Sequence, residues 1–179
     1  MSMQFEDQLR EEAIFEVAKK MAIAARTAPK GRGTDTMVIS VVKGDTIRKI
    51  AEKMKEMVGK DEAPAFFERD ANNILQSPVM LILGTRIKSL GLNPCGMCGY
   101  DNCEEKNQHP DQPCVFNTGD LGIAVGSAVS VAMDSRVDNR IMYTVGQAVM
   151  RMGLLGDDVK VVFGVPLSVS AKNPFFDRK

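Results

Sequence analysis

The chain has 179 residues, of which 44% are hydrophobic and 26% are charged, which is ordinary for a soluble protein of one domain. Basic and acidic residues both number 23, and this balance excludes a long-range attraction to nucleic acid or to an anionic membrane. The acidic N-terminus lacks the features of a signal peptide, and the longest apolar stretch, 121–133, is too short to span a bilayer. We therefore expect one cytoplasmic domain, 1–179, in which thiols stay reduced.

The first quarter of the chain predicts a long helix and a strand. Apolar residues recur at three- and four-residue steps over 4–26, as in an amphipathic helix, and Pro29 marks its end. Residues 36–42 are apolar and β-branched, which favours a strand. Asp45 then follows a glycine and precedes a second amphipathic pattern, so we expect it to be the N-cap of a second helix.

The middle of the chain combines one more helix with a buried strand and an irregular segment. Pro64 suits a first helical position, and the third helix is expected to end near Gln76. The wholly apolar run 78–84, PVMLILG, is typical of a strand covered on both faces. Residues 85–118 show no periodicity and hold every cysteine and the only histidine. A long irregular segment within a compact protein is usually functional.

The last third predicts two helices and a strand. The helices are expected at 119–133 and 137–153, the second one started by a capping box of Ser135 and Asp138. Small residues around Gly122-x-x-x-Gly126 indicate that the first of these helices packs closely against a neighbour. Residues 158–165 form the last expected strand. This mixture of helices and strands favours a layered α+β or α/β domain.

The cysteines have the spacing Cys95-x2-Cys98-x4-Cys103-x10-Cys114. Four thiolates are the number that a 4Fe–4S or 2Fe–2S cluster requires. Glycine follows each of the first two cysteines and would let the backbone turn tightly and direct N–H groups at sulfur. Because the segment is nearly balanced in charge, we expect these amides rather than basic residues to tune a cluster. The interpretation is a metal or iron–sulfur insert over 85–118.

Structural zinc is the alternative occupant of the four cysteines. Zinc also accepts four thiolates, although its common pattern is two separate C-x2-C pairs, and here the second pair is spread over ten residues. In that case the chain would be a non-enzymatic, zinc-stapled module that binds a protein partner. His109, beside a proline, is expected to be exposed polar surface rather than a ligand.

A short basic loop follows the first helix. Lys30, Gly31, Arg32 and Gly33 together could cradle a phosphate through backbone N–H groups and two cations. The other interpretation is a solvated turn that closes the helix. The sequence shows no Walker loop, GxGxxG, HExxH or GxSxG motif, and catalytic residues stay unknown.

Two resemblances add to this interpretation. The stretch NPCGMCGYDNC, with the later Cys114, resembles the cluster domain of anaerobic redox enzymes, and the chain is similar to uncharacterised ferredoxin-domain proteins of anaerobic bacteria and archaea. That resemblance implies an iron–sulfur cluster, most simply 4Fe–4S, in an oxygen-poor setting. The fourth cysteine comes earlier here than in the related enzymes, which leaves the cluster type open.

The second resemblance is to nitroreductases. The segment 24–31, AARTAPKG, resembles the AAxxAPSxxN segment of that family, 120–124 its central helix, and 159–166, with Arg178 beyond, its last strand and basic tail. It implies a nitroreductase-like α+β sheet with an inserted cluster loop, FMN and a homodimer. The RxSxR segment that grips the FMN phosphate in that family is absent.

The sequence therefore predicts an iron–sulfur redox protein, either an electron carrier or a flavin-linked oxidoreductase. Its substrate and its redox partner are not predicted, and neither is catalysis itself. No nucleic acid or membrane partner is expected.

Overall fold

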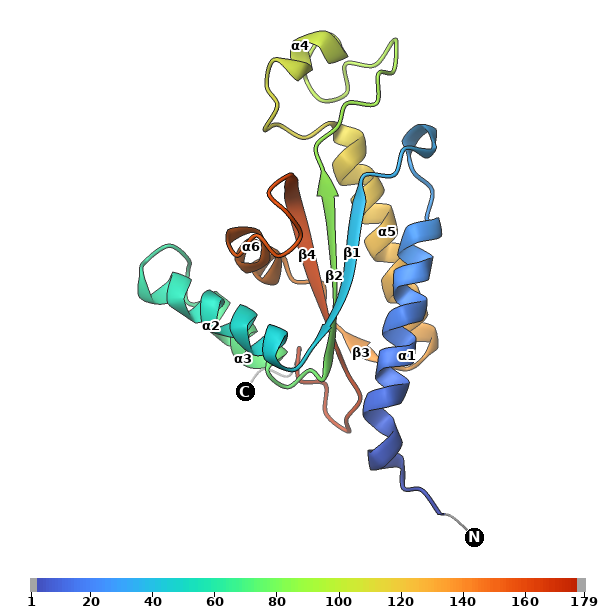
Figure 1. The fold of residues 1–179 in the computed structure, drawn as a ribbon, viewed down its shortest axis with the longest axis vertical. Helices are drawn as coiled ribbons and strands as arrows, with labels where there is room; N and C mark the ends of the chain where they lie inside the picture. The colour runs from blue at the N-terminus through green and yellow to red at the C-terminus, as the bar shows by residue number, and fades with distance from the viewer. Residues whose placement is uncertain (1–2, 177–179) are drawn as a thin grey trace.

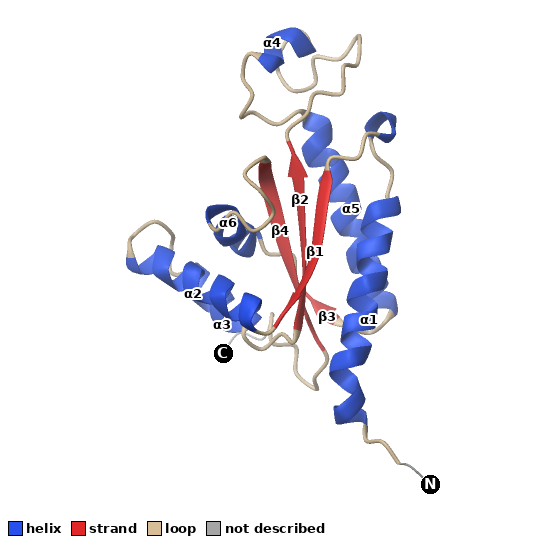
Figure 2. Cartoon of the chain, viewed as in Figure 1, coloured by secondary structure: helices blue, strands red, loops and turns tan. Residues whose placement is uncertain are grey.

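A four-stranded antiparallel sheet lies between two layers of helices, and a smaller segment extends from one end of the sheet (Figure 1, Figure 2). The computed structural model describes residues 3–176. The helices are α1 (Glu6–Thr27), α2 (Asp45–Gly59), α3 (Phe66–Ile74), α4 (Cys103–Asn107), α5 (Val115–Asp134) and α6 (Tyr143–Arg151), a short 3-10 turn η1 (Gly31–Gly33) follows α1, and the strands are β1 (Met37–Lys43), β2 (Val79–Arg86), β3 (Asp138–Asn139) and β4 (Val159–Ser168).

Strand β2 is central and covered on both faces. The strand order is β1-β2-β4-β3, and Ile82 of β2 pairs with Ser40 on one side and with Gly164 on the other. Every residue of β2 is buried except Arg86 at its end. A strand with helices on both faces needs apolar side chains at successive positions, which is what the run PVMLILG supplies.

Alternate residues of β2 enter two separate hydrophobic cores. Leu81 and Leu83 belong to the core under α1 and α5, whereas Met80 and Ile82 belong to the core under α2, α3 and α6. Figure 1 shows α1 and α5 side by side on one face of the sheet. The hydroxyl of Ser127 on α5 donates to the carbonyl oxygen of Ala24 on α1 at 3.1 Å. The period-two alternation of a strand thus divides one apolar run between two layers.

Helix α6 approaches β4 very closely. A Cβ added at Gly146 would overlap the carbonyl oxygen of Val162, and one added at Gly164 would overlap the side chain of Val145. Two glycines on facing elements therefore let the helix backbone lie almost against the strand.

Several predicted boundaries are wrong for identifiable reasons. Residues 137–142 do not begin a helix, because Asp138 and Asn139 form β3 against the end of β4 and Met142 forms a bridge to Gly164. Asp45 is the first residue of α2 rather than its N-cap, and its carboxylate pairs with Arg48.

Two further corrections concern α3 and α5. Helix α3 begins at Phe66, after Pro64. The glycines at 122 and 126 have no neighbour within 4 Å of a built Cβ, so they do not produce the close packing that their spacing suggested.

Among residues 3–176, α5 alone is long and apolar enough to cross a membrane by length and composition. The expected apolar stretch was shorter, and in this structure the helix packs against α1 and β2.

The α+β prediction of layered sheet and helices is confirmed. The cysteine segment leaves the end of β2 and returns at the start of α5, so it occupies 87–114 rather than 85–118. It is not wholly irregular, because it contains the short helix α4. Arg178 lies outside the described residues. We call residues 87–114 the insert.

Candidate functional site

The four cysteines are free thiols within the insert. Cys95 and Cys98 lie in the turns that follow β2, Cys103 is the first residue of α4, and Cys114 is the N-cap residue of α5. The first three are partly exposed, and Cys114 is buried. Cys95 and Cys103 line one hollow of about 630 Å³ together with 91–94 and 101–104. The structure therefore brings two of the predicted ligands to the same wall.

Two glycines shape the turns around the first cysteines. Gly96 and Gly99 have φ values of +73° and +89°, which are in the region that favours glycine. The N–H of Gly99 donates to the carbonyl oxygen of Gly96 at 3.0 Å. These positive φ values explain why glycine follows Cys95 and Cys98 in the sequence.

The four cysteine thiols are not gathered around one point in the described residues. Within residues 3–176, no group of three or more histidine, cysteine, aspartate or glutamate side chains is arranged to hold a metal ion. The set Cys95, Cys98, Cys103 and Cys114 thus stays a prediction. The donor chemistry of the insert nevertheless fits an iron–sulfur cluster, because it offers four free thiols.

Helix α4 is held at its start by reciprocal capping. The side-chain oxygen of Asn102 accepts from the N–H of Glu105 at 2.9 Å, and the carboxylate of Glu105 accepts from the N–H of Asp101 at 2.8 Å. This arrangement fixes the backbone on both sides of Cys103. The ring of Tyr100 stacks on His109, with centroids 5.1 Å apart, and His109 is exposed as expected.

Lys106 is a residue that the sequence argument missed. It is the one buried residue of α4, with 3% of its surface exposed, although its neighbours in the sequence are exposed. Lys106 lies three residues after Cys103, and residues at this spacing share a face only if the segment is helical. The sequence of 85–118 predicts an irregular segment, which has no helical face, whereas the structure contains α4.

The base of the insert is fixed by Asn117, which also escaped the sequence argument. Its side chain is fully buried, and it accepts from the N–H of Lys88 at 3.0 Å and donates to the carbonyl oxygen of Lys88 at 3.1 Å. The guanidinium of Arg32 donates to the carbonyl oxygens of Leu90 and Gly91 at 2.9 and 3.3 Å. Both contacts hold the first part of the insert against the folded domain.

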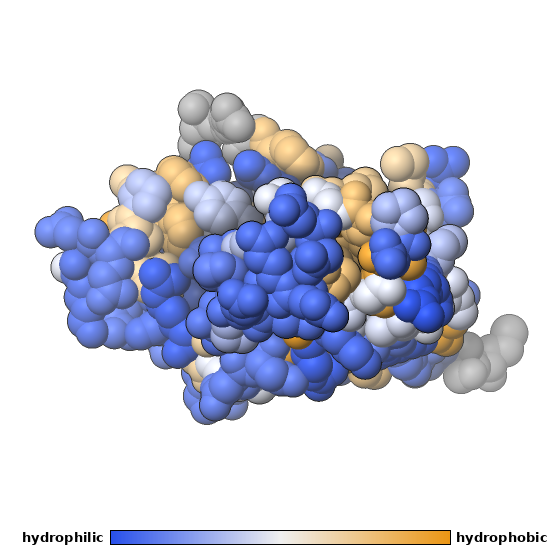
Figure 3. All heavy atoms as spheres, turned by 90° about the horizontal axis from the view of Figure 1, so that it is seen from above, coloured by the Kyte–Doolittle hydropathy of each residue, from blue (hydrophilic) through white to orange (hydrophobic). Residues whose placement is uncertain are grey.

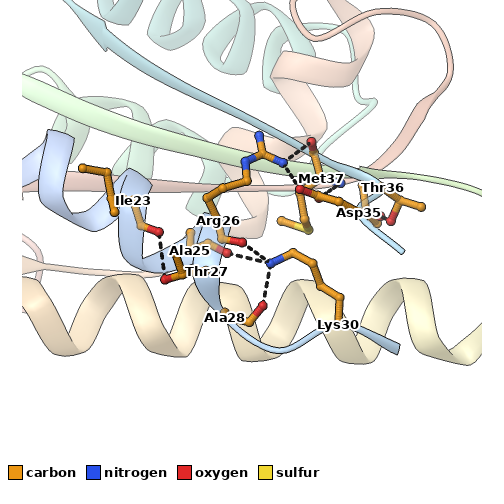
Figure 4. A network of polar contacts seen from close by, with 10 residues as sticks. Ile23, Ala25, Arg26, Thr27, Ala28, Lys30, Asp35, Thr36 and Met37 are labelled. Carbon is orange, nitrogen blue, oxygen red and sulfur yellow. Dashed lines mark hydrogen bonds and ion pairs between the residues drawn. The ribbon is translucent and has the colours of Figure 1, made fainter. Parts of the chain in front are cut away.

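The basic loop makes contacts with the protein itself. The ammonium of Lys30 donates to the carbonyl oxygens of Ala25, Arg26 and Ala28 at 3.0, 2.7 and 2.7 Å, so it closes the C-terminal end of α1 (Figure 4). Cations near this end of a helix interact favourably with its dipole.

The backbone N–H groups of Gly31 and Gly33 are also occupied. The N–H of Gly31 donates to the carboxylate of Asp120 on α5 at 3.0 and 3.1 Å, and the N–H of Gly33 donates to the carbonyl oxygen of Lys30 at 2.9 Å. In this arrangement the loop offers a phosphate few free donors, and a buried carboxylate lies beside it. The residues therefore do not fit a phosphate as they stand, and the cofactor-binding set Lys30–Gly33 stays a prediction.

Asp35 follows this loop and is paired with Arg26 at the end of α1. Partial burial by itself would raise the pKa of Asp35, but the hydrogen bond and charge of Arg26, with the N–H of Met37, outweigh it and lower the pKa. The pair ties the loop to β1 (Figure 4).

The end of the molecule that carries the insert is mainly hydrophilic in the middle of the view in Figure 3. This agrees with the sequence of the insert, in which residues 107–113, NQHPDQP, are all exposed.

Comparison with known proteins gives the family. Residues 111–178 match the model of the family described as uncharacterized protein containing a ferredoxin domain (DUF2148). An uncharacterized protein of Archaeoglobus fulgidus is 41% identical over 182 residues, which covers 97% of this chain and 96% of the relative. The chain belongs to this ferredoxin-domain family. The matched region contains Cys114, whereas the other three cysteines precede it.

Solved structures show the same fold at low sequence identity. A nitroreductase with bound FMN from Desulfitobacterium hafniense is 16% identical, with a TM-score of 0.59, and the match covers 95% of this chain and 92% of that protein. A nitroreductase family protein from Clostridium novyi is also 16% identical, with a TM-score of 0.56 and coverages of 86% and 73%. The nitroreductase-like framework is thus confirmed, and the family points to an iron–sulfur redox function. The zinc alternative finds no support among these matches.

Proposed function

We propose that this ferredoxin-domain protein is a one-electron carrier that holds a 4Fe–4S cluster on Cys95, Cys98, Cys103 and Cys114. The observation that supports the proposal most directly is the insert itself, which presents four free cysteine thiols at one end of the fold (Figure 1). A bound iron–sulfur cluster would supply reversible one-electron oxidation and reduction there. The electron comes from a reduced donor protein and leaves to an oxidised acceptor, with no net proton transfer.

The chain's own residues would shape such a site. The positive φ values of Gly96 and Gly99 allow tight turns, which would let backbone N–H groups donate hydrogen bonds to cluster sulfur and stabilise a negative cluster. Cys114 is the N-cap residue of the 20-residue helix α5, whose positive dipole end would interact favourably with a negative cluster. Asn117 and Arg32 keep the insert in place.

The first experiment is analysis of protein that is purified without oxygen. We expect about four iron and four acid-labile sulfide per chain, with a broad visible absorption that fades in air. Each single Cys→Ser variant should lose most of the iron, whereas His109→Ala should keep it, since His109 is exposed and stacked on Tyr100. Colourless protein with one zinc and no sulfide would overturn the proposal.

A flavin-linked oxidoreductase is the second candidate. It is supported by the fold, because solved relatives include an FMN-containing oxidoreductase and a nitroreductase with bound FMN. In this reading FMN binds at a site that includes Lys30–Gly33 after the loop rearranges. FMN released on denaturation would favour it, and Lys30→Met should then lower FMN content. Loss of stability without loss of flavin would assign Lys30 to α1 alone.

We also expect a homodimer in the cytoplasm of a cell that lives without oxygen. The exposed face of α5 carries one charged residue, Asp134 at its end, and otherwise includes the small and apolar residues Gly119, Gly122, Ile123, Gly126 and Met133. Light scattering during size-exclusion chromatography measures the mass, and a 19.6 kDa species would contradict the dimer.

A further inference from the structure

We propose that residues 30–33 form a clamp that holds the insert on the folded domain, and that the insert itself fills the space beside Gly31 that a cofactor phosphate would need. The inference does not rest on the proposed function, because none of the contacts that carry it involves a cysteine. It replaces the expectation that this loop cradles a phosphate, and it argues against the loop as the FMN site of the second candidate.

The first observation concerns the space beside Gly31. A Cβ built on Gly31 would lie 2.4 Å from the Cδ1 methyl carbon of Leu90 and 3.2 Å from the ring of Phe116. Leu90 belongs to the insert and is buried, and Phe116 lies in the first turn of α5. Not even a methyl group fits on this side of Gly31 unless a neighbour moves, so a phosphate does not fit there while Leu90 is in place.

The second observation concerns Arg32, which has a φ of +53°, a value that is uncommon for a residue other than glycine. Such a conformation persists where surrounding contacts compensate for its strain. The guanidinium of Arg32 donates to the carbonyl oxygens of Leu90 and Gly91 at 2.9 and 3.3 Å. The cation that a phosphate would recruit is thus bound to the backbone of the insert.

The third observation concerns charge. The N–H of Gly31 donates to both carboxylate oxygens of Asp120, which is buried on α5. Within residues 3–176, no lysine or arginine pairs with this carboxylate, and the ammonium of Lys30 donates to carbonyl oxygens at the end of α1 instead. A phosphate that took the N–H of Gly31 would displace Asp120 and lie beside its negative charge, which Coulomb repulsion disfavours.

The clamp joins three segments that are far apart in the sequence. The loop 30–33 follows α1, Leu90 lies near the start of the insert, and Phe116 lies just beyond its end. Because Asn117 pairs with the backbone of Lys88, both ends of the insert meet at this place. The position of the insert therefore depends on the loop, and a change in the loop should loosen the insert at both ends.

The test measures how tightly the insert is held when Arg32 is changed. Arg32→Asn removes the guanidinium, and asparagine tolerates a positive φ, so the backbone is not penalised. Arg32→Lys keeps a charged donor. Lys160→Gln is the matched control, because Lys160 reaches Asp111 of the insert at 3.7 Å through an exposed ion pair of little weight.

Three quantities are measured in the wild type and in each variant. They are the rate of cleavage by chymotrypsin within 89–113, the exchange rates of the Gly31 and Lys88 amides, and the flavin released on denaturation. These two amides report on the clamp because each donates to a side chain of α5. Circular dichroism checks that each variant is folded.

Arg32→Asn should raise the cleavage rate by about tenfold and speed the exchange of both amides, since bonds from a charged donor are lost. Arg32→Lys should lie between this variant and the wild type. Lys160→Gln should stay within about twofold of the wild type. The amount of any flavin released should be equal in all four proteins.

Unchanged cleavage and exchange in Arg32→Asn, or an equal rise in Lys160→Gln, would show that the loop does not hold the insert. A lower flavin content in Arg32→Asn, or slower exchange of the Gly31 amide when inorganic phosphate is added to the wild type, would assign the loop to an anion instead. None of these results bears on the cluster, which the iron and sulfide analysis tests separately.

A second variant decides the outcome if Arg32→Asn does not fold. Leu90→Ala keeps the carbonyl oxygen that Arg32 binds and removes the side chain beside Gly31. Faster cleavage of the insert in Leu90→Ala supports the clamp, and unchanged cleavage overturns it.

Discussion

The side chain of Asn117 makes hydrogen bonds of the kind that a backbone segment makes in a sheet. Its amide oxygen and nitrogen satisfy both the N–H and the C=O of Lys88, as a neighbouring strand would have done. The side chain of Asn117 is fully buried, and its two hydrogen bonds to Lys88 are partly buried. Asn117 thus pairs with the chain two residues after the end of β2 and attaches the start of the insert to α5.

Substitution of Asn117 by alanine should loosen this attachment. Both backbone groups of Lys88 would lose their partner at a partly buried position, which costs about 1–2 kcal/mol in the free energy of unfolding. Urea denaturation measures the loss, and proteolysis should cut the insert faster. Asn72→Ala on the exposed surface of α3 is the control, with a change within about 0.5 kcal/mol. Equal effects of the two variants would contradict the role of Asn117.

Asp35 makes part of the stability dependent on pH. Its pKa is lower in the folded protein than the value of about 3.9 expected in the unfolded chain. The stabilisation is therefore fully present above about pH 4, and it is lost as the pH falls through the lower folded pKa.

We expect Asp35→Asn to flatten the acid limb of the stability profile and to cost less than about 1 kcal/mol at neutral pH, since the pair with Arg26 is partly exposed. Arg26→Gln should flatten the same limb, because it removes the main group that lowers the pKa. Unfolding free energies between pH 2 and 7 provide the measurement. A limb of unchanged steepness in both variants would refute this assignment.

At the scale of elements, the contact between α6 and β4 depends on the absence of side chains. Gly146 and Gly164 let the two backbones meet, and any Cβ at Gly146 would overlap Val162. Such a contact cannot be relieved by a rotamer change, because the obstacle is backbone.

Gly146→Ala should consequently destabilise the protein by about 3 kcal/mol or more, despite the higher helix propensity of alanine. Gly59→Ala, at the end of α2 with open space around it, should be neutral or stabilising by up to about 1 kcal/mol. Thermal unfolding of the two variants tests this contrast. Similar melting temperatures would show that α6 can move away from β4.

An element can be predicted from the sequence when the interactions that form it involve residues near one another in the chain. The run PVMLILG predicts β2 correctly, because burial on both faces requires an apolar residue at every position. The start of α6 was wrong because residues 138 and 139 pair with β4, about 30 positions later in the chain. No local pattern contains that pairing. Helix α4 was missed because five residues are too few to show a period.

The candidate site shows the same limit. The cysteine spacing is a local signal and could be read directly, as could the turns at Gly96 and Gly99. Asn117 and Lys106 gain their meaning only from burial and from the elements around them. Lys30, interpreted as a phosphate ligand, instead meets three carbonyl oxygens that only the end of α1 brings together.

For the whole molecule, the two hydrophobic cores contain no residue of the insert. We therefore expect that removal of metal leaves the far-ultraviolet circular dichroism and the main thermal transition nearly unchanged. Amide hydrogen exchange should become faster in 87–114 alone. Global unfolding on chelation would contradict this expectation, since it is typical of small domains that fold only around a metal.

The position of the insert outside both cores also has a consequence for how the protein would be assembled and repaired in the cell. If the insert holds the proposed cluster, we expect the chain to fold without iron, so that the apoprotein could accumulate as a folded precursor and receive its inorganic centre later. Damage by oxygen would then strip the centre without destroying the polypeptide. The same molecule could be repaired and used again instead of being degraded and made anew.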